Sequence, residues 1–271
     1  MTKQAANRIH FSKMHGLGND FVVMNTIHQA IDLATLPIKQ LGDRHFGIGF
    51  DQLLLIEPSK QADFFCRIFN TDGSEAEQCG NGLRCVARYL REEGLHHAAK
   101  VSIETKAGIF KITIKNNDHI AVSMGVPCIE SNKTLLSLPS STTKIALHVV
   151  SMGNPHAIIH TDVIDRLTVA KHGKEISTHQ HFSAGINVGF MRIINPHHIE
   201  LRTYERGAGI THACGSNACA AVAAGITTGL LQQSVDVDYQ YGRLHVEWDD
   251  INKPIILSGP ATTVYSGVFS F

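Results

Sequence analysis

Two cysteines in matching sequence contexts have the chemistry needed to move a proton at a carbon atom. Cys79-Gly80 and Cys214-Gly215 are separated by almost half of the 271-residue chain, and each dipeptide opens a segment with helical features. Backbone N–H groups and the dipole at a helix N-terminus stabilise negative charge, which lowers the pKa of a thiol there. Two such helix ends together would bind one carboxylate and place a thiol on each face of its α-carbon.

An internal repeat extends beyond these cysteines, and the separation between Cys79 and Cys214 is its offset. One matched pair of residues would be chance, but four polar pairs in one register indicate two similar halves. We therefore expect two domains that face each other, with a site lined from both. The matched positions are Gly18-Asn19 with Gly153-Asn154, Gln52 with Asn187, Phe69-Asn70 with Tyr204-Glu205, and Cys79-Gly80 with Cys214-Gly215.

The elements that must position these residues are mostly strands, in an α+β fold of two pseudo-symmetric domains, each a strand-rich sheet wrapped around a central helix. Apolar residues with helical spacing predict an amphipathic helix that ends near Gly94; they are Leu83, Val86, Ala87 and Leu90. The alanine-rich run 218–224 predicts a buried helix. A hairpin is predicted around Asn116-Asn117-Asp118, between strands Gly108–Lys115 and His119–Met124. Further strands are expected at Phe21–Asn25, Gln52–Glu57, Phe64–Asn70, Lys144–Val150, His156–His160, Asn187–Ile194, His198–Tyr204 and Arg243–Trp248.

Composition and charge exclude several classes of protein. Lys and Arg number 24 and Asp and Glu also number 24, so the formal charge is zero and no nucleic-acid footprint is expected. The chain is 43% hydrophobic and 18% charged, which is ordinary for a globular protein. No apolar run reaches the roughly 18 residues of a membrane helix, and residues 1–15 have no secretory apolar region. We therefore expect a cytoplasmic protein without a membrane partner.

Simpler interpretations exist for most of the reactive side chains. A cysteine is most often a small buried hydrophobe, which is the interpretation adopted for Cys66, Cys85, Cys128 and Cys219. Cys79 and Cys214 could instead form a regulatory disulfide. The sequence has no Cys-x-x-Cys, and its 17 histidines are mostly scattered, so no metal site is expected. The asparagines could be turn formers, Glu205-Arg206 a surface ion pair and His156 a packed strand residue.

These residues lie in ordered motifs that resemble the diaminopimelate epimerase family, whose members epimerise an amino acid without a cofactor. The resemblance runs from Phe11 to the C-terminus. It rests on the segments Lys13–Phe21, Asp51-Gln52, Phe69–Glu75, Gln78–Gly82, Gly153–His156, Asn187–Gly189, Glu205–Gly209 and Ala213–Ser216.

The resemblance implies interconversion of LL- and meso-diaminopimelate without pyridoxal phosphate or metal. It implies that Cys79 is the proton acceptor and Cys214 the donor, with roles that exchange with reaction direction. His156 is implied as a supporting residue, and Tyr265 matches a position linked to contact within a homodimer. The implied substrate-binding residues are Asn19, Gln52, Asn70, Gly80, Asn81, Asn154, Asn187, Glu205, Arg206, Gly215 and Ser216.

The resemblance also implies where the domains divide. The family's final strand crosses back to the first domain, so residues 1–118 with 262–271 would form one domain and residues 119–261 the other. The active site would lie in the cleft between them, and the domains would close over substrate. Closure supplies the water-excluded electrostatic environment that a carbanion needs when no cofactor accepts its electrons.

Two positions depart from the family pattern, and two alternative functions remain open. Ile210 stands where an acidic residue is common, and Asn217 stands where glycine is common. The first alternative is another thiol-based racemase of this fold, acting on proline or hydroxyproline. The second is a redox-sensing protein that binds an amino acid without turnover.

Overall fold

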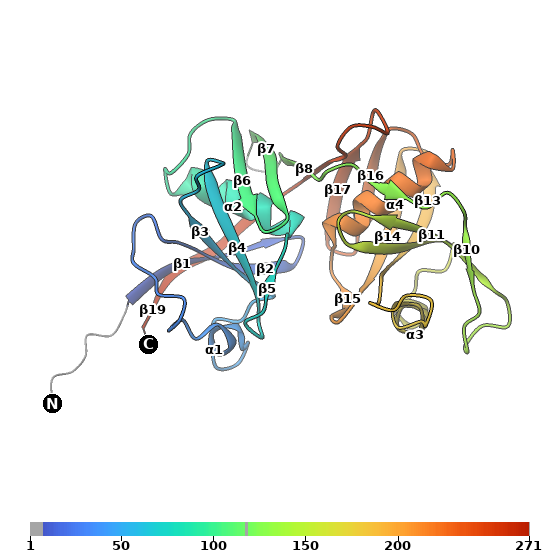
Figure 1. Ribbon diagram of the computed structural model, residues 1–271, viewed down its shortest axis with the longest axis horizontal. Coiled ribbons are helices and arrows are strands. Elements are labelled where there is room, and N and C mark those ends of the chain that lie inside the picture. The colour runs from blue at the N-terminus through green and yellow to red at the C-terminus, as the bar shows by residue number, and fades with distance from the viewer. Residues whose placement is uncertain (1–7, 117–118, 271) are drawn as a thin grey trace. The chain divides into compact units, whose positions relative to one another are not determined.

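The chain folds into two compact units. The computed structural model describes residues 8–116 and 119–270, so the Asn117-Asp118 part of the expected hairpin turn lies outside the described residues. Unit 1 takes in the chain up to Ile120 and the segment from Pro260 onward, and unit 2 runs from Ala121 to Gly259. The strand-rich α+β class predicted from the sequence is confirmed (Figure 1).

Unit 1 surrounds helix α2 with strands. Strand β19 pairs with β1, β1 with β2, β2 with β3, and β3 with β4. The β2–β3 pairing is parallel and the other three are antiparallel. The elements are β1 Arg8–Gly16, β2 Asn19–Asn25, α1 Ile38–Gly42, β3 Gln52–Glu57, β4 Phe64–Asn70, β5 Glu75–Ala76, α2 Gly80–Glu92, β6 Lys100–Thr105, β7 Gly108–Asn116 and β19 Thr262–Ser270, with β8 His119–Ser123 at the division between the units.

The apolar residues of unit 1 explain this arrangement. Residues 53–56 of β3 are fully buried, as expected for a central strand covered on both faces. The four apolar residues predicted to form one face of a helix are all buried in α2, which ends at Glu92. Gly94 follows with a φ of 68°, a left-handed conformation that glycine adopts without steric cost and that commonly terminates helices.

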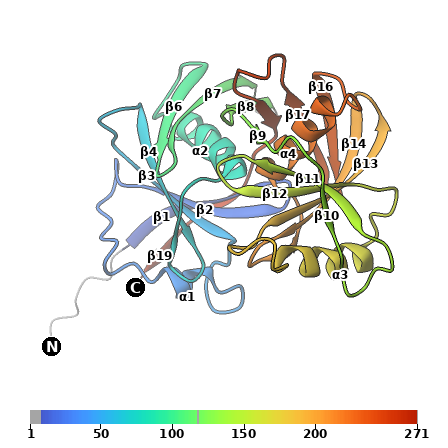
Figure 2. The same ribbon diagram turned by 45° about the vertical axis from the view of Figure 1, so that its right-hand side comes forward.

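Unit 2 is built in the same way around helix α4. Every residue from Gly215 to Gly225 is buried, so the alanine-rich run is a core helix, as predicted. Figure 2 shows α4 beside strands β11 and β12, with which it makes contacts. The elements are β9 Cys128–Ile129, β10 Thr134–Leu136, β11 Ile145–Ser151, β12 Pro155–His160, α3 Arg166–Ser177, β13 Asn187–Asn195, β14 His198–Glu205, β15 Gly209–Thr211, α4 Gly215–Thr227, β16 Ser234–Tyr239, β17 Gly242–Glu247 and β18 Ile256–Gly259.

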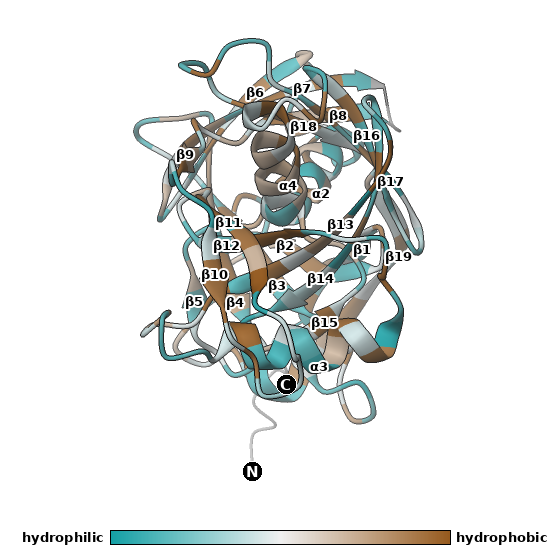
Figure 3. Ribbon diagram, turned by 90° about the vertical axis from the view of Figure 1, so that its right-hand side faces the viewer, coloured by the Kyte–Doolittle hydropathy of each residue, from teal (hydrophilic) through white to brown (hydrophobic). Residues whose placement is uncertain are grey.

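Helix α3 is a feature that the sequence analysis did not predict. Its N-cap is Asp165, whose side chain accepts hydrogen bonds from the backbone N–H groups of Leu167 and Thr168. Hydrophilic and hydrophobic residues both occur along α3 (Figure 3). Val169 and Ile176 are its buried apolar residues, and they join the core of unit 2.

The internal repeat is visible in the strand registers. Phe21 pairs with Gln52 in the parallel β2–β3 ladder, and His156 pairs with Asn187 in the parallel β12–β13 ladder. Adding the repeat offset to the residue numbers of the first pair gives those of the second pair. The antiparallel pairs Leu53–Phe69 and Val188–Tyr204 obey the same offset. Helices α2 and α4 each contain 13 residues. The two units are therefore two versions of one pattern.

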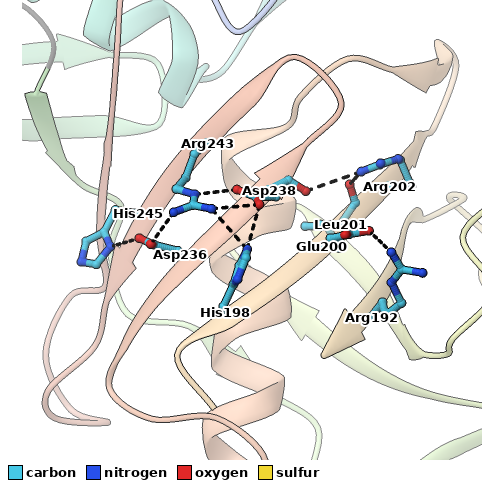
Figure 4. A network of polar contacts seen from close by, with 9 residues as sticks. All are labelled: Arg192, His198, Glu200, Leu201, Arg202, Asp236, Asp238, Arg243 and His245. Atoms are coloured by element: carbon cyan, nitrogen blue, oxygen red, sulfur yellow. Dashed lines mark hydrogen bonds and ion pairs between the residues drawn. The ribbon is translucent and has the colours of Figure 1, made fainter. Parts of the chain in front are cut away.

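A network of charged side chains covers part of the sheet in unit 2 (Figure 4). Arg243 bridges Asp236 and Asp238 at 2.9 and 2.6 Å, and His198 contacts Asp238 at 2.8 Å. The Arg243 side chain is 50% exposed. Among the described residues, no group of three His, Cys, Asp or Glu residues could hold a metal ion.

Candidate active site

The predicted site residues of unit 1 surround Cys79. Cys79 is the N-cap of α2, and its Sγ accepts a hydrogen bond from the Gly82 N–H at 3.4 Å. Gly80 and Asn81 form the start of the first turn. The Asn19 Oδ1 atom lies 3.9 Å from Cys79 Sγ and accepts a hydrogen bond from Asn81 Nδ2 at 3.1 Å. The N-terminus of α2, the Cys79 thiol and the amides of Asn19 and Asn81 are therefore in contact with one another.

A tight turn brings Asn19 to this point. Strands β1 and β2 pair up to Gly16 and Asn19, which leaves Leu17 and Gly18 as a two-residue hairpin turn. Both turn residues have positive φ, 55° and 86°, as a type I′ turn requires. A leucine rarely adopts this conformation. Here the Leu17 side chain is buried, which accounts for an apolar residue in the turn.

Gln52 and Asn70 form a second amide pair in unit 1. They face each other across the antiparallel β3–β4 ladder, and Gln52 Nε2 donates to Asn70 Oδ1 at 2.9 Å. Asn70 Nδ2 in turn donates to Ser74 Oγ at 3.0 Å. Gln52 also pairs in register with Phe21, two residues after Asn19, so strand pairing gathers the predicted polar residues of this half.

Asn19 contacts a cluster of four charged residues that was not predicted from the sequence. The members of this cluster are Lys13, Asp20, Arg44 and Asp51. Arg44 binds Asp20 through both of its terminal nitrogens, at 2.9 and 2.7 Å, and it also contacts Asp51 at 2.8 Å. Lys13 contacts Asp20 at 2.5 Å. Burial raises the pKa of Asp20, but the hydrogen bonds from Arg44 and Lys13 outweigh it and lower the pKa to about 2.

The predicted site residues of unit 2 include Cys214 and its neighbours. Cys214 is the N-cap of α4, Gly215 and Ser216 start its first turn, and the Tyr239 hydroxyl donates to the Cys214 carbonyl at 2.8 Å. Cys214 Sγ lies 3.4 Å from Ser216 Oγ, which accepts a hydrogen bond from Asn154 Nδ2 at 3.5 Å. These contacts link the sulfur to a hydroxyl and, through that hydroxyl, to an amide.

His156 continues this chain of contacts into the core of unit 2. Its Nε2 lies 3.1 Å from Asn154 Oδ1, and the residue is completely buried on β12. Burial lowers the pKa of His156 to about 3, so its ring is neutral at pH 7. A neutral ring with Nε2 protonated donates to the Asn154 carbonyl oxygen and holds that amide in place.

The remaining predicted residues of unit 2 lie at the ends of β13 and β14. Asn187 Oδ1 accepts the backbone N–H of Arg206 at 3.0 Å, and Thr211 Oγ1 donates to Glu205 Oε1 at 2.5 Å. The exposed Arg206 guanidinium donates to the Ala184 carbonyl at 2.7 Å. The positively charged group of this half is thus at the surface of unit 2.

The other cysteines differ in their surroundings. Burial raises the pKa of Cys85 to about 12 and raises the pKa of Cys66 as well, and Cys219 is also buried. The expectation that Cys128 is buried was wrong, because its side chain is exposed. Cys128 opens the two-residue strand β9, whose side chains are exposed or partly exposed and therefore do not enter the core.

Tyr265, the predicted dimer contact, lies on β19 opposite Lys13 of β1. Its ring packs edge-on against Phe11, with ring centroids 6.0 Å apart. The side chain is nevertheless 46% exposed, and it is flanked by the exposed Val264. Strand β19 therefore presents apolar side chains to its surroundings.

The two departures from the family pattern have different structural settings. Ile210 lies on β15 and is exposed. Asn217 is fully buried in the first turn of α4, and neither of its side-chain polar atoms has a hydrogen-bond partner among the described residues. A Cβ atom at Gly189 would lie 2.3 Å from Asn217 Oδ1, so glycine at 189 provides the space that Asn217 occupies.

Comparisons with known proteins give a consistent result. The family model described as "Diaminopimelate epimerase" matches residues 11–129 and 148–264. The chain is 44% identical over 270 residues to the diaminopimelate epimerase of Azoarcus sp. (strain BH72), covering 96% of this chain and 98% of that protein.

Solved structures share the fold at much lower sequence identity. A phenazine biosynthesis protein of the PhzF family from Bacillus anthracis has a TM-score of 0.74 at 17% identity, covering 97% of this chain and 99% of that one. A hydroxyproline epimerase from Agrobacterium vitis, with bound trans-4-OH-L-proline, has the same TM-score at 15% identity, covering 97% and 93%. Within the described residues, no helix is both long and apolar enough to span a membrane.

Proposed function

The chain belongs to the diaminopimelate epimerase family of isomerases, and we propose that Cys79 and Cys214 are the two bases that interconvert LL- and meso-diaminopimelate. The observation that carries the proposal is that both cysteines occupy the N-cap of a 13-residue helix, in equivalent positions of the repeat. The reaction acts on a small molecule and belongs to lysine biosynthesis.

The proposed mechanism uses one thiolate and one thiol. The Cys79 thiolate removes the α-proton, and the electron pair left on the α-carbon then takes a proton from the Cys214 thiol on the opposite face. The sulfurs exchange protonation states in the reverse direction. Two sulfurs that flank one α-carbon interact electrostatically, so a thiolate at one disfavours a thiolate at the other and the two titrate as a coupled pair.

The helix N-termini supply the electrostatic part of the mechanism. Deprotonation at the α-carbon delocalises negative charge onto the substrate carboxylate, and N–H groups of Gly80, Asn81, Gly215 and Ser216 are proposed to bind this end. Preorganised donors in a water-excluded site stabilise developing charge without reorganisation. No electron-accepting cofactor is needed in this scheme.

The far end of the substrate is assigned to the remaining polar residues. Diaminopimelate has an amino and a carboxylate group at each end, so its non-reacting end needs a cation and several acceptors. Arg206 is proposed to bind the distal carboxylate, because its guanidinium is exposed and can form two parallel hydrogen bonds. The proposed further contacts are Asn19, Gln52, Asn70, Asn154, Asn187 and Glu205.

Isotope incorporation tests the two-base proposal directly. LL-diaminopimelate turned over in heavy water should yield meso product labelled at the α-carbon before label appears in the remaining substrate. Two bases on opposite faces give this result, because the incoming proton comes from a group equilibrated with solvent. Return of the original hydrogen to the product would show a single base and overturn the proposal.

A homodimer and a cytoplasmic location stay predictions. The exposed Tyr265 and Val264 on β19 support a contact between two copies of the chain. Tyr265→Lys should shift the sedimentation coefficient from that of a dimer to that of a monomer. Val163→Lys is the control, since Val163 is 53% exposed and lies in a loop.

A further inference from the structure

The amides beside Cys79 belong to a continuous chain of hydrogen bonds with a charged group at each end. The fully buried Arg84 donates to Asn81 Oδ1 at 2.9 Å, and Asn81 Nδ2 donates to Asn19 Oδ1 at 3.1 Å. Asn19 Nδ2 donates to Asp51 Oδ2 at 2.9 Å. The chain therefore runs from a guanidinium through two amides to a carboxylate.

These contacts determine which way each amide points. If the Asn19 amide were flipped, its carbonyl oxygen would face the Asp51 carboxylate and its NH2 group would face that of Asn81. A flip of the Asn81 amide would direct its NH2 group at the Arg84 guanidinium. Donors would then meet donors and acceptors would meet acceptors, so one orientation is strongly favoured.

Arg44 holds the carboxylate at the end of the chain. It contacts Asp51 Oδ1 at 2.8 Å, leaving Oδ2 to accept from the Asn19 side chain and from the backbone N–H of Asp20 at 3.1 Å. The Asp51 N–H donates to the Asp20 carbonyl at 2.9 Å. Asp51 is thus fixed by backbone and side-chain contacts although 44% of its side chain is exposed.

We infer that Asp51, held by Arg44, is a positioning residue that keeps the carbonyl oxygen of Asn19 directed at Cys79. The inference rests on the proposed role of Cys79 and names a residue that acts on it through Asn19. Without Asp51, the Asn19 side chain loses the acceptor that fixes its NH2 group and samples other rotamers. The thiol would then spend less time in its productive environment.

A double-mutant cycle in kcat/KM tests this inference. Asp51→Ala removes a hydrogen bond between a carboxylate and the Asn19 amide, and it should lower kcat/KM about 10-fold. If Asp51 acts through Asn19, the Asn19→Ala/Asp51→Ala double variant should be no slower than Asn19→Ala. Asp32→Ala is the control, because Asp32 is an exposed carboxylate that accepts from the backbone N–H of Ala34, and it should keep the activity of the wild type.

A second variant and a second readout separate positioning from folding. Arg44→Ala leaves the Asp51 carboxylate in place and removes from it only an exposed ion pair, so it should cause a smaller loss, about threefold, that also disappears in the Asn19→Ala background. Alkylation by iodoacetamide, followed by mass spectrometry without substrate, should show a changed pH profile at Cys79 and an unchanged one at Cys214 in Asp51→Ala.

The possible failures are distinguishable. The positioning role would be overturned if Asp51→Ala kept wild-type kcat/KM. It would also be overturned if Asp51→Ala lowered kcat/KM by the same factor in the wild-type and the Asn19→Ala backgrounds. Neither outcome would affect the two-thiol mechanism. Normal epimerisation by Cys79→Ala would overturn the proposed function instead, whatever the behaviour of Asp51.

Discussion

The N-termini of α2 and α4 are built from one repeated pattern but hold their polar groups by different means. Around Cys79, the amides end on charged residues, with Arg84 on one side and Asp51 with Arg44 on the other. Around Cys214, the described contacts run through the Ser216 hydroxyl and the Asn154 amide to buried His156, whose ring is neutral at pH 7. The same backbone geometry is therefore accompanied by different polar partners in the two units.

The repeat offset shows that the charged positions around Cys79 have uncharged equivalents in unit 2. Applied to Asp20, Asp51 and Arg84, it leads to Pro155, Ile186 and Cys219, none of which carries a charge. Burial alone does not explain the difference, because both helices are buried along most of their length. In α2 the buried charge of Arg84 is hydrogen-bonded to the Asn81 side chain and to the Pro260 carbonyl.

The largest expected effect tests whether the two halves are equally necessary. Cys79→Ala and Cys214→Ala should each lower kcat at least 100-fold, because general acid–base groups typically contribute about 100- to 10,000-fold. Cys128→Ala is the control, since Cys128 is exposed and opens the short strand β9. Steady-state epimerisation measures all three, and near-normal activity of either mutant at an N-cap would contradict the two-base proposal.

Substitution of Arg206 tests a position at which the two units differ in charge. The equivalent position in unit 1 is Thr71, so a cation for the distal carboxylate is present at this point of unit 2 alone. If bound substrate covers the exposed Arg206 guanidinium, losing this charged partner costs about 2–5 kcal/mol, so Arg206→Ala should lower kcat/KM about 30-fold or more. Thr71→Ala is the matched control. Unchanged kinetics of Arg206→Ala with diaminopimelate would remove Arg206 from the site.

Each unit should lose folding stability over a different range of acid pH, because a different group titrates in each. The pKa of buried His156 is about 3, below its ordinary 6.5, so the unfolded chain binds a proton between these values that the folded chain does not. Stability is therefore lost as pH falls from about 6.5 to 3, by several kcal/mol. For Asp20, the loss falls between the ordinary pKa of 3.8 and about 2 and is smaller because solvent screens the contact.

Substitutions separate these two windows. His156→Phe, which copies Phe21 of the other half, should flatten the stability profile between pH 6.5 and 3, whereas Asp20→Asn should flatten it below pH 4. Urea unfolding across this pH range measures both. His28→Phe, at an exposed histidine, should leave the profile unchanged. An unaltered slope in His156→Phe would show that His156 is protonated in the folded protein.

The smallest expected effect concerns a second arginine that bridges two aspartates. Arg243 joins Asp236 and Asp238 as Arg44 joins Asp20 and Asp51, and both arginine side chains are about half exposed. The partners differ, because Asp236 and Asp238 are 37% and 30% exposed, whereas Asp20 is 14% exposed. Exposed ion pairs contribute about 0–1 kcal/mol each, so Arg243→Ala should lower the free energy of unfolding by about 1 kcal/mol and leave kcat/KM unchanged. The loss should be smaller at high salt. A loss above about 3 kcal/mol would exceed what such exposed pairs contribute and would contradict this.

The sequence predicts those parts of the fold that local residue patterns control. The bounds of β3 and β4 agree with the prediction, because each strand is a short apolar run flanked by polar residues. Helix α3 was missed because its apolar residues are few, although Asp165 is an N-cap signal. Strand β16 was also missed, although Val235, Val237 and Tyr239 alternate with polar residues.

The candidate site was predictable where it repeats and not where it depends on tertiary contacts. The Cys-Gly contexts indicated two helix N-termini, and the structure places both cysteines at N-caps. The cluster behind Asn19 was not predictable in this way. Asp20 and Asp51 are far apart in the sequence, and only the parallel pairing of β2 with β3 brings them together.

The return of β19 to unit 1 sets the order in which the molecule can be completed during synthesis. Arg8 of β1 pairs with Ser270 of β19, so translation reaches this partner only after the whole of unit 2 has been made. Unit 2 is continuous in sequence and can fold as soon as it leaves the ribosome, whereas unit 1 must wait with one side of β1 unpaired. The half that is translated first is therefore the half that is finished last.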